Sequence, residues 1–376
     1  MKTNEFVPFR AVHPLEVVKD EIKARGMTNA EFAQRLDMKP SNLSRLLKDK
    51  QDITIALANK LESALGIDAS FWLNMQATYC KDIEAVAGRD AKENGAMEAE
   101  KMLASALNLK ELYSRLKIRS SLFIHEKLER LREIYGVDPL HIPTLQKASA
   151  EAYKRSDKRE TDDKNLKTWS LLALASAKNN VPPTEYVKGN AAKAASEIAS
   201  KANMSKIAEQ DIKQILNDNG ISYSVVAKSD KTPIDAYSSW WCDYPAVVTT
   251  HRYNDIDRLV FNVLHELGHI ELHLTKHTNE AFIAEDNDHS HDDAKEIEAN
   301  EFAENMIVPA PMWKEITKAK SIGIGANDIV RYLKAEAKKR NLNFGLLMWR
   351  YKFETSRYAF RGVKSTAITN PIASAY

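Results

Sequence analysis

The stretch His265-Glu266-Leu267-Gly268-His269 decides how the second half of this chain folds. It follows the pattern HExxH, in which two histidines bind a zinc ion and the glutamate acts on water held by that ion. Histidines four residues apart lie on one face of a helix, so both imidazoles can reach the same metal. The spacing therefore predicts a helix from Asp257 to Leu274 that carries a metal site, with Glu266 facing the open coordination position.

A second helical pattern downstream offers a third ligand. Glu296 and Asn300 fit an arrangement in which a carboxylate binds zinc and the residue four positions on orients a ligand histidine. Glu298 is the alternative ligand, because Glu296 and Glu298 cannot both face the metal from one helix. His273 lies four residues after His269, on the same side of the predicted helix as the two ligand histidines. We expect it to pack or to support the ligands. The acidic stretch 285–293 is better explained as a loop between the two ligand helices than as a cation site.

The residues before the HExxH helix predict a small sheet and, ahead of it, mostly helix. Ile221–Val226 alternates like a half-buried strand, and Ala246–Thr250 is a second β-rich run. From about residue 85 to residue 228 the chain is rich in Ala, Lys and Glu and predicts helices, with breaks at Gly136–Pro139 and Val181–Pro183.

The first eighty residues predict short helices with clear boundaries. Gly26 ends the first helix, and Thr28–Glu31 is a capping box that opens the second. A tight turn at Asp37–Lys39 leads to a third helix that starts at Pro40. Further helices are expected from Thr54 to Leu65 and from Ser70 to Tyr79.

Two helices joined by a three-residue turn, the second with short polar residues near its start, are typical of a helix-turn-helix that binds double-stranded DNA. The expected base-reading residues are Ser41, Asn42 and Arg45, and the expected phosphate-binding residues are Lys39, Ser44 and Lys48. The alternative is that this face is only solvated, in a domain that serves dimerisation or toxin binding.

Composition sets the remaining limits. The 376 residues suggest two or three domains, and 54 Lys+Arg against 52 Asp+Glu give a net charge of +2, so DNA binding must depend on a local surface. The two cysteines, Cys80 and Cys242, lack metal-ligand spacing and favour a reducing cytoplasm. We expect no signal peptide and no membrane span, since the richest apolar stretch, Trp169–Ala177, is short.

The N-terminal segment resembles the XRE-like DNA-binding domains of HigA-type antitoxins. The residues that carry the resemblance include His13-Pro14, Met27–Ala33, Ser44–Leu47, Asp52–Thr54, Leu65-Gly66, Phe71–Asn74, Gln76 and Tyr79. Asp37 departs from the glycine usual in the turn, but aspartate tolerates a left-handed backbone better than most residues. A homodimer is expected, because such proteins usually read paired half-sites.

The stretch His265–His273, together with Glu296–Pro309, resembles the ImmA/IrrE family of metallopeptidase-like proteins, and Arg258 and Phe261 match the usual approach to the motif. The resemblance implies zinc on His265, His269 and Glu296, with Glu266 as the general base. There are two alternatives to a catalytic site. The histidines could cap a core without binding metal, or a zinc ion could only hold two helices together.

The sequence as a whole predicts a mainly α protein with a small sheet (α+β). We expect an all-α helix-turn-helix domain (1–82), a helical interaction region (83–200) and a zincin-like, gluzincin-type domain (201–376). The leading hypothesis is a DNA-binding regulator with a zinc metallopeptidase domain that cleaves a partner repressor. The rival is a non-enzymatic antitoxin and autorepressor that neutralises a toxin, and a third possibility is an oligomeric scaffold.

Overall fold

The structure, a computed structural model, describes residues 7–137, 162–204, 207–240, 243–276, 281–285, 294–318, 326–357, 360 and 363–376. It forms two compact units, Met1–Ala99 with Phe123–His125, and Glu100–Leu122 with Glu126–Tyr376. The first unit is helical, and the second combines helices with one small sheet, so the α+β prediction is confirmed. The predicted division into three domains at residues 82 and 200 stays a prediction.

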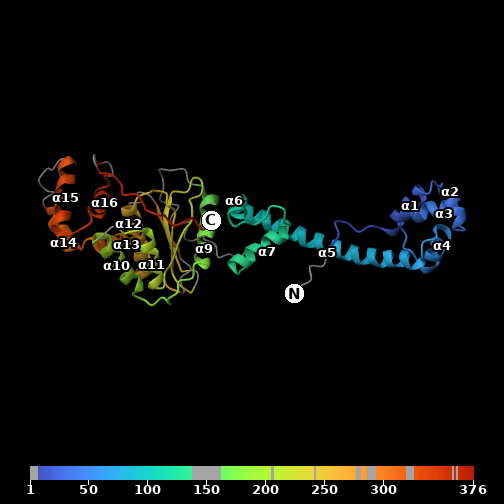
Figure 1. Cartoon of the computed structure of the whole chain (residues 1–376), viewed down its shortest axis with the longest axis horizontal. Coiled ribbons are helices and arrows are strands. Elements are labelled where there is room, and N and C mark those ends of the chain that lie inside the picture. Colours follow the sequence, from blue (N-terminus) through green and yellow to red (C-terminus); the bar gives the residue numbers. More distant parts are fainter. Residues whose placement is uncertain are drawn as a thin grey trace. The chain divides into compact units, whose positions relative to one another are not determined.

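Helices α1 to α4 and most of α5 supply the first unit (Figure 1). Their bounds are α1 Pro14–Ala24, α2 Asn29–Arg35, α3 Pro40–Asp49, α4 Ile55–Leu65 and α5 Ala69–Ala106. The predicted capping box is present: Thr28 Oγ1 accepts from the Glu31 backbone N–H at 3.2 Å, and Glu31 Oε2 accepts from the Thr28 backbone N–H at 2.7 Å. Asp37 has a φ of 49°, so the turn between α2 and α3 uses the left-handed backbone that the sequence required.

A buried core fixes α3 against the other helices of this unit. Phe32, Leu43 and Trp72 are fully buried in that core. Gln76 of α5 accepts from the Ile53 backbone N–H at 3.0 Å and donates to the Asp52 carboxylate at 2.8 Å. The loop between α3 and α4 is therefore fixed to α5 by a partly buried polar contact.

Helix α5 is much longer than the predicted Ser70–Tyr79, because it continues without a break to Ala106. No proline interrupts this stretch, and each of its two glycines, Gly88 and Gly95, costs only about 1 kcal/mol of helix stability. Within the described residues, no helix combines the length and apolar character that crossing a bilayer requires.

The second unit is built around a four-stranded sheet. Its helices are α6 Leu109–Arg115, most of α7 Ile124–Tyr135, α9 Asp163–Asn179, α10 Asn190–Met204, α11 Glu209–Asp218, α12 Ile256–Leu272, α13 Ala294–Ile307, α14 Ala310–Lys318, α15 Ala326–Arg340 and α16 Phe344–Thr355. Its strands are β1 Ser222–Val225, β2 Ile234–Ser239, β3 Ala246–Thr249 and β4 Ala281–Glu285. The predicted helix breaks are confirmed, because α7 ends before Gly136 and α9 ends before Val181.

The strand order is β1-β3-β2-β4, with β1 parallel to β3 and the other neighbouring pairs antiparallel. Helix α9 packs on one face of the sheet and α11 and α12 pack on the other, with α10 and α13 packed against α12 (Figure 1). The prediction of a half-buried β1 is wrong: all four of its residues are buried, because helices lie on both of its sides. Strand β2 was not predicted, since its sequence Ile-Asp-Ala-Tyr-Ser-Ser is half polar, yet it too is buried throughout.

Candidate metal centre and DNA-reading helix

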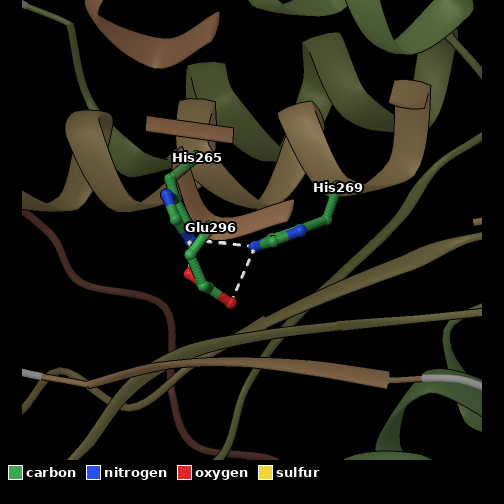
Figure 2. Close-up of side chains that lie close together, drawn as sticks. All are labelled: His265, His269 and Glu296. Carbon is green, nitrogen blue, oxygen red and sulfur yellow. Dashed lines mark hydrogen bonds and ion pairs between the residues drawn. The ribbon is translucent and has the colours of Figure 1, made fainter. Parts of the chain in front are cut away.

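Helix α12 carries the HExxH residues in the core of the second unit. Asp255 caps its start by accepting from the backbone N–H groups of Asp257 and Arg258. Apolar residues such as Leu264 and Leu267 bury the helix around most of its circumference. His265 and His269 project from α12 toward the Glu296 carboxylate of α13 (Figure 2).

The three side chains form a compact triangle of metal-binding atoms. The two Nε2 atoms of His265 and His269 lie 3.0 Å apart, and they lie 3.3 and 3.5 Å from Glu296 Oε2 and Oε1 respectively. Zinc–nitrogen bonds of about 2.0–2.1 Å in a tetrahedral site place two ligand atoms about 3.3 Å apart. Two imidazoles and one carboxylate at these separations therefore fit a single zinc ion.

A close approach of α12 to α13 brings Glu296 to the histidines. A Cβ atom built on Gly268 would lie 3.0 Å from Ala299 Cα and 3.2 Å from the Ala299 carbonyl oxygen. Any side chain at position 268 would thus push against the backbone of α13. The glycine inside HELGH is required by the distance between the two helices that hold the site.

Asn300 lies where the sequence predicted, with its Oδ1 atom 2.8 Å from His265 Nδ1. If Nδ1–H donates to this oxygen, the lone pair of His265 Nε2 is directed at the centre of the triangle. The structure brings Glu296, and not the alternative Glu298, to the two histidines. Glu298 instead contacts His273, a pairing that the sequence did not predict.

The charges at the site favour metal binding. Burial disfavours ionisation of Glu296, but its contacts with the two histidines outweigh burial and hold its pKa well below the usual range. Burial lowers the pKa of His269 to about 4, so its imidazole is neutral at pH 7. Burial would also lower the pKa of His265, but hydrogen bonding to Glu296 and its charge raise it. Because a metal ligand must be a neutral imidazole, metal binding by His265 would be coupled to loss of its proton.

Glu266, the predicted base, is fully buried. Its charge helps to raise the pKa of His265, so the carboxylate lies within electrostatic reach of the triangle. Residues 286–293 of the acidic stretch fall outside the described residues, as does Cys242. The expectation that the acidic stretch forms a loop rather than a cation site stays a prediction.

Helix α3 presents the residues predicted to read DNA. Leu43 and Leu47 are buried, which turns the opposite face of the helix outward. The exposed residues include all six that the sequence singled out, namely Lys39, Ser41, Asn42, Ser44, Arg45 and Lys48. Lys39 is the N-cap residue of α3, and the others lie within its first three turns.

Comparison with known proteins finds one family match in each half of the chain. Residues 18–72 match the helix-turn-helix family, and residues 223–324 match the family described as the IrrE N-terminal-like domain. The uncharacterized HTH-type transcriptional regulator YddM of Escherichia coli (strain K12) is 32% identical over 66 residues, which are 70% of its length and 18% of this chain. The chain belongs to the helix-turn-helix family and carries an IrrE-like domain.

Other relatives of the helix-turn-helix domain come from Dichelobacter nodosus. Virulence-associated protein I and virulence-associated protein A' are each 34% identical, over 70 and 68 residues, or 18% of this chain. The chain covers 65% and 59% of their lengths, less than two thirds of either. A solved structure from Nostoc punctiforme, described as a candidate antidote protein of a plasmid maintenance system, is 27% identical. It matches 25% of this chain and 94% of its own, with a TM-score of 0.18.

We predict that Gly268→Val weakens zinc binding by the IrrE-like domain about tenfold or more, because moving α13 shifts Glu296 away from the two histidines. Competition with a zinc chelator measures this affinity. Gly88→Val is the matched control, since a Cβ at position 88 of α5 would meet nothing within 4 Å. Equal affinities for the two variants would contradict the packing argument.

Proposed function

We propose that this chain is a DNA-binding regulator whose IrrE-like domain is a zinc metallopeptidase that cleaves a partner regulatory protein. The observation that carries the proposal is the triangle formed by the buried His265 and His269 with the partly exposed Glu296, with Glu266 directly following His265 on α12. A site that only held helices together would have no use for the fourth group, whereas hydrolysis needs a base next to the metal.

The proposed DNA-binding half rests on α3. Arg45 and Asn42 offer the side chains best suited to guanine and adenine edges in the major groove. Lys39, Ser44 and Lys48 would bind phosphates and set the position of α3. We expect a homodimer on a two-fold operator in the cytoplasm, because one helix-turn-helix reads only a half-site.

In the proposed peptidase half, zinc would supply Lewis-acid chemistry, polarising a peptide carbonyl and acidifying water. His265, His269 and Glu296 would hold the ion, and Asn300 fixes the ring orientation of His265. Glu266 would accept a proton from water and pass it to the departing amine. Cleaving a repressor would then link hydrolysis to transcription.

Full burial of Glu266 favours a second candidate function. A general base has to meet water and substrate, so hydrolysis would require the site to open. If it stays closed, the metal would be structural or sensory. The chain would then act as a non-enzymatic antitoxin and autorepressor, which binds its operator and neutralises a toxin.

Arg45→Ala should weaken binding to the operator about 10- to 100-fold and change binding to random DNA much less, since a bidentate contact to guanine carries about 1–3 kcal/mol of discrimination. Titration of labelled duplexes at several salt concentrations measures both. Arg25→Ala, which removes an arginine that pairs with Glu21 on α1, is the matched control. An equal loss on both duplexes would mean that Arg45 binds phosphate and that another face reads the bases.

Glu266→Gln should abolish cleavage while zinc stays bound, because an amide cannot accept the proton but leaves the three ligands intact. The assay incubates purified chain with candidate repressors and follows the fragments by mass spectrometry. Glu301→Gln, an exposed change on α13, should cleave like the wild type. Equal cleavage by Glu266→Gln, or none by any form on any candidate, would remove the peptidase claim and favour the antitoxin.

A further inference from the structure

A second chain of contacts runs from His269 away from the metal site. His269 Nδ1 lies 3.0 Å from His273 Nδ1, and His273 Nε2 lies 2.9 Å from Glu298 Oε2. His273 is the C-cap residue of α12 and its side chain is 5% exposed, whereas Glu298 stands on α13 and is 58% exposed. The contacts thus connect a buried imidazole to a carboxylate at the surface.

One assignment of hydrogens satisfies all of these contacts at once. For His269 Nε2 to offer its lone pair to a metal, the ring hydrogen has to sit on Nδ1. His269 Nδ1–H then donates to His273 Nδ1, which leaves the hydrogen of the second ring on Nε2. His273 Nε2–H in turn donates to Glu298. The reverse assignment would place a hydrogen on His269 Nε2, where a metal would bind.

The two candidate ligand histidines are therefore supported in different ways. His265 has a direct partner, the Asn300 amide oxygen. His269 has an imidazole, which can accept on Nδ1 only while its own hydrogen is held on Nε2. Glu298, a full carboxylate, is the group that holds it there. Replacing Glu298 removes an acceptor that favours the His273 tautomer able to accept from His269.

We propose that His273 and Glu298 are positioning residues that hold His269 in its metal-binding tautomer and orientation. This inference rests on the proposed metal centre and adds to it two residues that do not touch the ion. Partners of this kind typically change metal affinity 10- to 100-fold. Because more than half of the Glu298 side chain is exposed, solvent weakens its interaction, and we expect the lower end of that range for it.

The test measures the zinc affinity of the full chain by competition with a chromophoric chelator. Glu298→Ala should weaken zinc binding about tenfold, and His273→Phe about 10- to 100-fold. Glu298→Gln keeps an acceptor oxygen and should recover most of the wild-type affinity. Glu301→Ala, the same charge change three residues further along α13, is the matched control and should bind like the wild type. Melting of each metal-free variant checks that it folds.

The double variant His273→Phe/Glu298→Ala distinguishes positioning from a general loss of charge. Since Glu298 acts only through His273, the double variant should bind zinc as weakly as His273→Phe alone. Additive losses, or equal affinities of Glu298→Ala and Glu301→Ala, would overturn the positioning role and leave the metal centre standing. A wild-type chain that binds no zinc would overturn the metal centre and the positioning role with it.

Discussion

The close contact of α12 with α13 is the constraint on which the candidate metal centre depends. Neither helix can form the triangle alone, because α12 supplies two imidazoles and α13 supplies the carboxylate. The helices approach so closely only because position 268 has no side chain and Ala299 opposite it has a small one. Glu296, Glu298 and Asn300, at every second position of α13, then all reach histidines on α12 or at its C-cap.

Local chemistry explains what the sequence alone could predict. The four-residue spacing predicted that the two histidines share a helix face, Thr28 with Glu31 predicted the start of a helix, and Asp37 predicted the left-handed turn. Each prediction used only residues that are close in the chain. The choice between Glu296 and Glu298 as the third ligand depends on how α12 and α13 pack against each other. The spacing of residues in the sequence carries no information about that packing. Strand β2 was missed because its buried polar residues match no alternating pattern. The predicted end of α5 was too early, because its two glycines destabilise the helix too little to end it.

The two halves of the chain rest on different kinds of support. The helix-turn-helix assignment follows from the family match and from the exposed face of α3, which any DNA-reading helix needs. The proposed metal centre rests on the geometry of three side chains within the IrrE-like domain. Burial holds the two ligand histidines in position, and it also encloses Glu266. The same burial that favours metal binding therefore limits the access of a substrate to the base. Hydrolysis and sensing differ in whether that enclosure opens.

The most direct test of the account is the zinc X-ray absorption spectrum of the purified full chain, together with its metal content. We predict one zinc ion per chain, bound by nitrogen and oxygen ligands at about 2.0–2.2 Å with two imidazoles among them. Replacing Glu296 with alanine should remove most of the zinc. Absence of stoichiometric zinc, or sulfur ligands at about 2.3 Å, would contradict the proposed centre.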